Sequence, residues 1–85
     1  MFYVYILKSE KDGKNYIGYT SNLKLRLEEH QQGLVKSTKN RKPLKLVYFE
    51  AFLSETDARN EERYLKSGGR ANNDLKTKIK ESLNL

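Results

Sequence analysis

The fold is decided by residues 3–20, which read YVYILKSEKDGKNYIGYT. Two β-prone runs, residues 2–7 and 15–20, flank a short polar segment that contains the pair Asp12-Gly13. An Asp-Gly pair between two such runs is among the strongest short-range signals of a β-hairpin. We therefore expect the two runs to form strands that pair antiparallel.

A helix is expected to follow the hairpin at once. Ser21 or Asn22 can cap its N-terminus by accepting a hydrogen bond from a backbone N–H, and Gly33 is a stop signal. Helical spacing puts the following residues on one stripe: Leu23, Arg26, Leu27, His30 and, beyond the helix end, Leu34. Arg26 and His30 are thus predicted to lie one turn apart on the same side of the helix.

A basic loop and a third strand come next. The loop, residues 35–45, contains no acidic residue and five basic ones: Lys36, Lys39, Arg41, Lys42 and Lys45. Residues 44–52 are β-prone and apolar on both alternating sets, which is typical of a strand covered on both faces. We therefore expect helices to cover this strand on both sides.

The C-terminal part is predicted to be helical. Residues 54–57 resemble a capping box, and the helix that they open carries Ala58, Glu62 and Leu65 on one stripe. Residues 67–69 end that helix, and Asn73 or Asp74 is expected to cap a last one. The predicted fold is α+β, with a three-stranded antiparallel sheet flanked by helices in the order ββαβαα. Residues 1–85 are expected to form a single domain.

Composition restricts the function. The chain has no cysteine, which excludes disulfides, thiolate zinc sites and thiol nucleophiles. Its longest apolar stretch is too short to span a membrane, and we expect a cytoplasmic protein with no membrane partner. A net charge of +6 on 85 residues favours a polyanionic partner, with nucleic acid first and an anionic membrane second.

Glu62 is the residue that the apolar pattern does not explain. It lies between Ala58 and Leu65 on the stripe that should face the sheet, where an unpaired carboxylate is costly. From the pattern, Glu62 pairs with a buried arginine such as Arg26, binds a metal ion, or simply lies at the boundary of the buried face. Likewise, Tyr5, Tyr16 and His30 taken one by one are compatible with purely structural roles.

Taken together and in order, these residues resemble the GIY-YIG nuclease superfamily, in particular its small stand-alone members. Residues 3–5, Tyr-Val-Tyr, correspond to the first motif, although tyrosine and valine replace its glycine and isoleucine. Residues 16–18 are a literal Tyr-Ile-Gly. The helical arginine and histidine of the family match Arg26 and His30, and its metal-binding glutamate matches Glu62.

The resemblance implies a metal-dependent DNA endonuclease that hydrolyses phosphodiester bonds with one Mg²⁺ or Mn²⁺ ion. It also implies a role for each matched residue. Glu62 binds the metal ion, Arg26 holds the scissile phosphate, and Tyr5 takes the proton of the attacking water. Tyr16 contacts the phosphate or the leaving-group side, and His30 orients a tyrosine or relays a proton.

The basic loop is expected to bind the DNA through Lys36, Lys39, Arg41 and Lys42, mainly by phosphate contacts. No helix carries a surface suited to reading bases, so we expect recognition of DNA structure, branched or single-stranded DNA included, in repair or recombination. A non-catalytic nucleic-acid-binding module or subunit is the alternative. A partner protein and the oligomeric state stay open.

Overall fold

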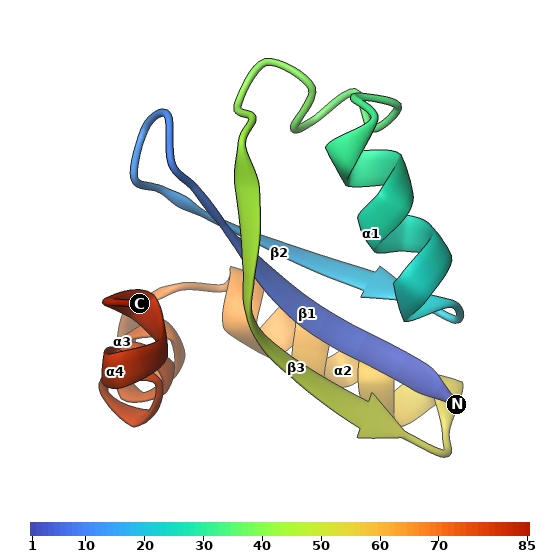
Figure 1. Ribbon diagram of the computed structural model, residues 1–85. Helices are drawn as coiled ribbons and strands as arrows, with labels where there is room; N and C mark the ends of the chain where they lie inside the picture. Colours follow the sequence, from blue (N-terminus) through green and yellow to red (C-terminus); the bar gives the residue numbers. More distant parts are fainter.

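The central element of the computed structural model, which describes residues 1–85, is strand β1 (Phe2–Ser9). It pairs antiparallel with both β2 (Asn15–Thr20) and β3 (Leu44–Phe52), so that the strand order is β2-β1-β3 (Figure 1). Helices lie on both faces of this sheet, and the predicted α+β class is confirmed. The predicted hairpin is present too, because β1 and β2 pair from Tyr3↔Thr20 to Lys8↔Asn15.

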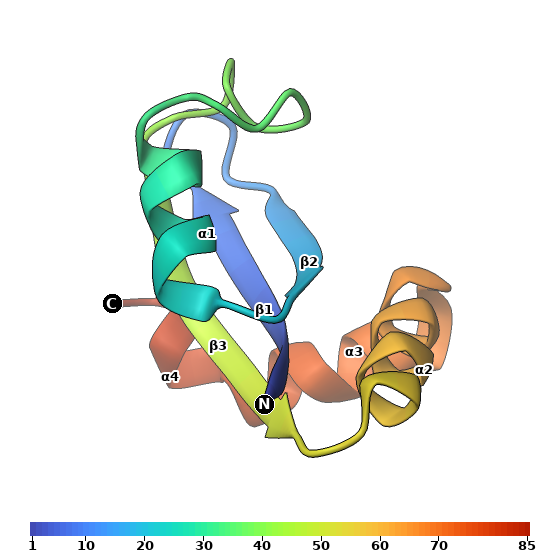
Figure 2. The same ribbon diagram turned by 90° about the vertical axis from the view of Figure 1, so that its right-hand side faces the viewer.

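Alternation along β1 divides the core between the two faces of the sheet. Val4 points toward α2 (Glu55–Lys66), where it packs against Ala58 and Leu65. Tyr5 points to the other face, toward α1 (Leu23–Gln31), where its cluster includes Leu7, Leu44, Leu23 and Leu27. Figure 2, which views the sheet from its side, shows α1 and α2 on opposite sides of the strands. Every second residue of β1 is therefore available to the α1 face.

The first two helices begin where the sequence predicts. Asn22 caps α1 by accepting from Leu25 N, and Ser54 caps α2 by accepting from Asp57 N. Gly33 has a φ of +76°, a left-handed conformation that favours glycine after a helix end. The prediction for Leu34 is wrong: it is 68% exposed, because the chain turns away at Gly33 before Leu34 can continue the helical stripe.

Strand β3 is covered on both faces over only part of its length, which corrects a second expectation in part. Its pairing with β1 shifts between Ile6 and Leu7, so that Val47 is an extra residue on β3. This bulge interrupts the alternation, and it explains why apolar residues occupy both sets of positions. Helix α1 leaves the end of the strand uncovered, and Phe49 is 51% exposed.

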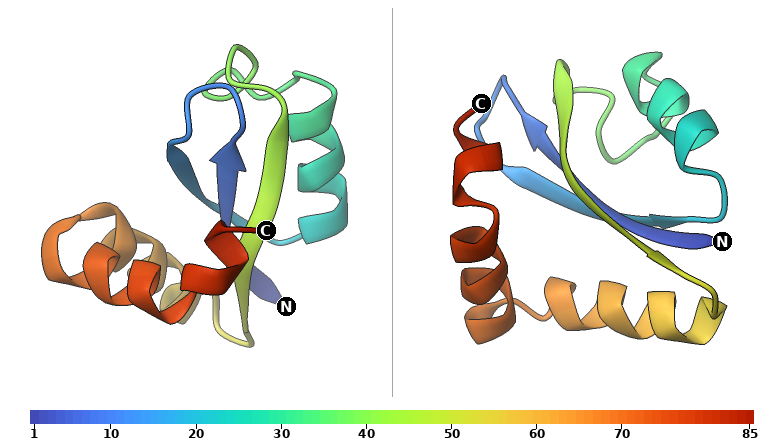
Figure 3. Two further views of the ribbon diagram at one scale, coloured as in Figure 1. Left: turned by 60° about the vertical axis from the view of Figure 1, so that its left-hand side comes forward. Right: turned by 60° about the horizontal axis from the view of Figure 1, so that its bottom comes forward.

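The C-terminal region begins its helix earlier than predicted. Helix α3 (Gly69–Lys78) starts directly after Gly68, so neither Asn73 nor Asp74 is its cap, and α4 (Lys80–Leu83) follows a break at Ile79. Ile79 is buried against Ile6 and Val47, so this break fastens the C-terminal segment to the sheet. Figure 3 shows α3 beside the end of α2, at a steep angle to it, and α4 further along the chain, where it packs against β3. None of the helices combines the length and the apolar character needed to span a membrane.

Candidate active site

The candidate site is built around Tyr5, whose ring lies over Gly18 of the neighbouring strand. The two residues face each other in the β1–β2 register. A methyl group placed on Gly18 would collide with the ring and the hydroxyl of Tyr5. Glycine is therefore required at this position by the close approach of the tyrosine ring, and not by an unusual backbone angle. The phenol thereby extends across β2, the edge strand.

Tyr16 and His30 complete an aromatic cluster with Tyr5 on the α1 face. The ring centroids are 6.4 Å apart for Tyr5 and Tyr16, 5.6 Å for Tyr5 and His30, and 5.3 Å for Tyr16 and His30. The hydroxyl of Tyr5 also lies 2.8 Å from Nε2 of His30, within hydrogen-bonding distance. Three of the residues singled out in the sequence thus come together, from two strands and one helix.

Thr38, which the sequence gave no reason to select, contacts the other ring nitrogen of His30. Its Oγ1 lies 2.7 Å from Nδ1, and both side chains are completely buried. Burial, together with the positive charge of Arg26, lowers the pKa of His30 to about 4. His30 is therefore neutral at physiological pH. The only hint of Thr38 in the sequence is a threonine within a basic loop, which is compatible with many surface roles.

Because the pKa of His30 is lowered, the protein should lose stability on acidification. This loss should begin at a higher pH than the one at which carboxylates titrate. Below pH 6.5 the unfolded chain binds a proton on this histidine, whereas the folded protein does not until about pH 4. The free energy of unfolding should therefore fall as the pH decreases from 6.5 to 4, by at most about 3 kcal/mol. Urea unfolding at a series of pH values measures this loss.

The variant His30→Gln separates this effect from other titrations. His30 is the only histidine in the chain, and glutamine does not titrate. The carboxylates therefore contribute alike to the pH dependence of both proteins. The difference in unfolding free energy between the two proteins should depend on pH only in this window. A constant difference from pH 7 to pH 4 would contradict the buried neutral histidine.

Arg26 lies at the border of this cluster, with its side chain 35% exposed. Its NH1 pairs with Oε1 of Glu29 at 3.3 Å, one turn further along α1. Burial raises the pKa of Tyr5 to about 12, and the nearby guanidinium of Arg26 offsets part of this rise. Arg26 is therefore placed to act on the charge of the phenol and is still accessible to an anion from solvent.

Glu62 approaches β2 from the opposite side, on α2. The side chain of Arg59 lies 3.8 Å above the ring of Tyr19 on β2, and its NH1 is 3.9 Å from Oε1 of Glu62. Lys66 donates to Oε2 of Glu62 at 2.8 Å, and the carboxylate is 15% exposed. No ion pair joins Glu62 to Arg26. Of the three interpretations of Glu62, pairing with a buried arginine is thus wrong, because its partners are surface cations of its own helix.

The site offers an oxygen donor suited to a hard divalent ion, but only one. No group of three or more His, Cys, Asp or Glu side chains is arranged to hold a metal. Mg²⁺ commonly binds through one or two carboxylates and fills its other positions with water and substrate phosphate. Glu62 fits that pattern once its ion pair with Lys66 is broken. The negative charge of Glu62 also contributes, as the smallest effect, to the raised pKa of Tyr5, so the two side chains lie within electrostatic range.

The basic loop packs beside the β1–β2 turn, at the end of the sheet nearest the C-terminus of α1 (Figure 1). Arg41 differs from the three lysines predicted with it, because its Nε donates to Asp12 at 3.0 Å and its carbonyl accepts from Ser9 Oγ. Arg41 therefore anchors the loop to the hairpin. Lys36, Lys39 and Lys42 are exposed, and no acidic side chain pairs with them.

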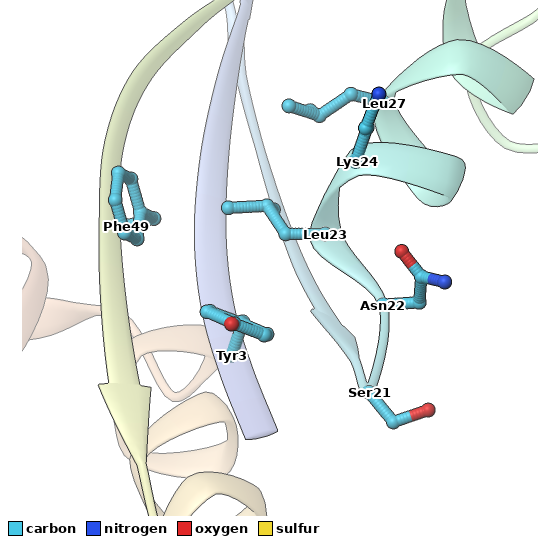
Figure 4. Close-up of a pocket in the computed structure, with 7 residues that line it drawn as sticks. All are labelled: Tyr3, Ser21, Asn22, Leu23, Lys24, Leu27 and Phe49. Carbon is cyan, nitrogen blue, oxygen red and sulfur yellow. The ribbon is translucent and has the colours of Figure 1, made fainter. Parts of the chain in front are cut away.

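A groove of about 510 Å³ opens on the same face of the sheet, next to the aromatic cluster. Figure 4 shows Tyr3 and Phe49 on the strands facing Leu23 of α1 across it, with Asn22 and Lys24 at its border. Leu23 also packs against the Tyr5 cluster, so the groove and the candidate site are continuous. None of the predicted site residues lines it. Asn72 of α3 donates to Leu65 O at the end of α2, away from this face.

Comparisons with known proteins show to which family the chain is similar. A model of the GIY-YIG catalytic domain matches residues 1–76. The UPF0213 protein of Clostridium perfringens is 48% identical over 67 residues, which cover 78% of this chain and 71% of the relative. The UPF0213 protein of Staphylococcus haemolyticus is 44% identical over 69 residues, covering 80% and 83%. The solution NMR structure of a UPF0213 protein from Bacillus halodurans has a TM-score of 0.59 at 35% sequence identity, covering 94% of this chain and 86% of that one.

Proposed function

The chain belongs to the family of GIY-YIG catalytic domains, and on this premise we propose that it is a DNA endonuclease that uses a single Mg²⁺ or Mn²⁺ ion. The family implies nuclease-type activity. The observation that carries the proposal for this chain is the cluster of Tyr5, Tyr16 and His30 beside Arg26. These side chains match the motif residues and meet on the α1 face of the sheet, and Glu62 lies within electrostatic range of Tyr5.

Each side chain of the site has the proposed role that suits its chemistry. Arg26 exchanges Glu29 for the scissile phosphate, which its planar and permanently charged guanidinium can hold by two hydrogen bonds. Glu62 would hold the divalent ion, which when bound neutralises the charge that develops on the phosphate. Tyr16, half-buried next to Tyr5, contacts the phosphate or the leaving-group oxygen. Each of these interactions favours the transition state because negative charge increases there.

Tyr5 acts as the general base in this proposal, which requires its phenolate form. The phenol must first release its own proton, and its oxygen then accepts the proton of the attacking water. A pKa of about 12 makes the phenolate rare in the free protein at neutral pH. Arg26 already lowers that pKa in part, and the cations gathered at the site would favour the phenolate further.

DNA binding is proposed to use the three loop lysines with which no acidic side chain pairs. Replacing Lys36, Lys39 and Lys42 together by Gln should weaken DNA binding and reduce its salt dependence. If each lysine contacts one phosphate of duplex DNA, the slope of log K against log salt should decrease by about 3. Fluorescence anisotropy with labelled DNA at several salt concentrations measures this slope.

Three exposed lysines elsewhere provide the matched control. Lys76, Lys78 and Lys80 lie on α3 and α4, which pack against α2 and β3 and not against α1. Their replacement by Gln removes the same charge from the protein. Equal changes of slope for the two triple variants would show that net charge, and not the loop, accounts for the binding.

A cleavage assay tests the proposed function. Labelled single-stranded, duplex, flapped and four-way-junction DNA should be incubated with the protein in Mg²⁺, Mn²⁺ or EDTA. We expect products that depend on the divalent ion, and more of them from branched or single-stranded DNA than from plain duplex. Such a preference would fit a cytoplasmic role in repair or recombination. Products that persist in EDTA would contradict the metal-dependent mechanism.

A non-catalytic nucleic-acid-binding module is the second candidate, and two observations favour it. Glu62 is paired with Lys66, and Tyr5 is completely buried, so neither is free in the unbound protein. A binding module needs the loop lysines but not these two groups. Salt-sensitive binding without cleavage of any of the four DNA substrates would support this candidate.

A further inference from the structure

The groove between α1 and the strands is lined by residues that the proposed catalysis does not use. Its volume of about 510 Å³ is within the range of small-ligand sites. Tyr3 of β1 and Phe49 of β3 form one wall, and Leu23 of α1 faces them (Figure 4). The ring centroids of Tyr3 and Phe49 are 6.3 Å apart, and the ring planes are tilted by 59°. Because Phe49 is 51% exposed, a flat ligand can reach its ring.

The register of the sheet places this groove beside Tyr5. Phe49 is directly opposite Tyr5 on β3, and Gly18 is directly opposite it on β2. Such cross-strand neighbours have Cβ atoms about 4.5–5.5 Å apart. The ring of Tyr5 extends over Gly18, so the phenol and Phe49 lie on opposite sides of the Tyr5 backbone. The groove can therefore hold one part of a DNA strand of which another part lies at the candidate site.

The border of the groove carries a positive charge and hydrogen-bonding groups. Lys24 is the one charged residue among those that line it, and none of them is acidic. Asn22 caps α1 through its Oδ1, and its amide nitrogen makes no hydrogen bond to the protein. The hydroxyl of Ser21 lies on the same border. This border complements an anionic ligand that has a flat apolar part and polar edges.

The size of the groove and the state of the DNA restrict the ligand further. A specific protein interface uses about 20–30 residues from each partner, whereas seven residues line this groove. A base inside a duplex is paired and stacked, and it must leave the stack before it can enter a pocket. An unpaired base has free faces, which stack on exposed aromatic side chains. The groove therefore fits an unpaired base better than a protein segment or a duplex.

We propose that this groove binds an unpaired base of single-stranded DNA. The base stacks on Phe49 and Tyr3, and Lys24 contacts a neighbouring phosphate. Every base has an aromatic face, so the groove does not select a sequence. The inference rests on the proposed function for its substrate, and it makes the groove the part of the protein that distinguishes single-stranded from duplex DNA.

Two oligonucleotides of equal length and charge separate base stacking from phosphate contacts. One is a labelled single strand of thymidines, and the other has an abasic site at every position. Fluorescence anisotropy in EDTA measures both affinities without cleavage. We expect the protein to bind the strand with bases about 5- to 150-fold more tightly. Equal affinities would overturn the proposal.

Three variants test whether the groove is responsible for this ratio of affinities. Phe49→Leu keeps an apolar side chain without a ring, so the ratio should decrease, whereas Phe49→Tyr keeps the ring and should retain it. Tyr64→Leu is the matched control, because Tyr64 is 56% exposed but lies on α2, on the opposite side of the sheet. An unchanged ratio in a folded Phe49→Leu protein, or the same decrease in Tyr64→Leu, would contradict the assignment to the groove.

Two other results would also remove the proposed site. Sedimentation that shows a dimer of the original protein and a monomer of Phe49→Leu would assign the groove to a second copy of the chain. No binding of either oligonucleotide would contradict both the base site and the proposed DNA binding. The two proposals can still be told apart. Binding that depends on bases, without cleavage of any DNA, would support the groove and refute the endonuclease, whereas cleavage with equal affinities would refute only the groove.

Discussion

Replacing Glu62 by Gln is expected to reduce DNA cleavage by at least about 10³-fold, with little change in DNA affinity. Glutamine has nearly the same size as glutamate but cannot offer a charged oxygen to a divalent ion. Glu62 is proposed to contact the ion and not the DNA, so the affinity measured in EDTA should not decrease. The pair with Lys66 is at the protein surface, so its loss should cost only about 0–1 kcal/mol of stability.

Asp57→Asn is the matched control for this prediction. Asp57 is an exposed carboxylate on the same helix, so its replacement removes the same charge from α2. Cleavage and binding by the control should both remain close to those of the original protein. A parallel loss of binding and cleavage in Glu62→Gln would argue that the residue supports the fold or the DNA contact, and not the ion.

The sequence predicts the sheet well because its signals are local. The turn at Asp12-Gly13, the caps at Asn22 and Ser54 and the stop at Gly33 each depend on residues within one turn of chain. The family resemblance implies that His30 orients a tyrosine, and in the structure its ring lies beside those of Tyr5 and Tyr16. Whether they have the predicted catalytic roles is a proposal that the experiments above and below test.

Four of the features that the sequence does not predict depend on contacts between distant segments. The bulge at Val47 requires knowledge of the register with β1, and the exposure of Phe49 depends on how far α1 reaches. Arg41 looks like its neighbouring lysines until Asp12 is placed beside it by the fold. Thr38 becomes significant only when the loop brings it to Nδ1 of His30.

Tyr5→Phe is the second change with a large expected effect, a loss of cleavage of about 10²–10⁴-fold. The ring and its packing over Gly18 are kept, and only the oxygen that accepts the proton is removed. His30 Nε2 loses its partner in a buried place, which should also lower the free energy of unfolding by about 1–3 kcal/mol. The rate must therefore be measured well below the melting temperature of the variant, so that the loss reflects chemistry.

The pH dependence of cleavage distinguishes a base from a packing residue. Burial raises the pKa of Tyr5 to about 12, so the phenolate fraction, and with it kcat/KM, should increase with pH throughout the neutral and mildly alkaline range. Tyr5→Phe should remove this increase. Tyr48→Phe is the control, since burial raises the pKa of Tyr48 to about 12 as well, but that residue lies beside Glu50 and Glu61 on the other face of the sheet. Because the two tyrosines titrate in the same range, only their positions can separate their effects. A pH dependence that survives Tyr5→Phe would assign the base to another group.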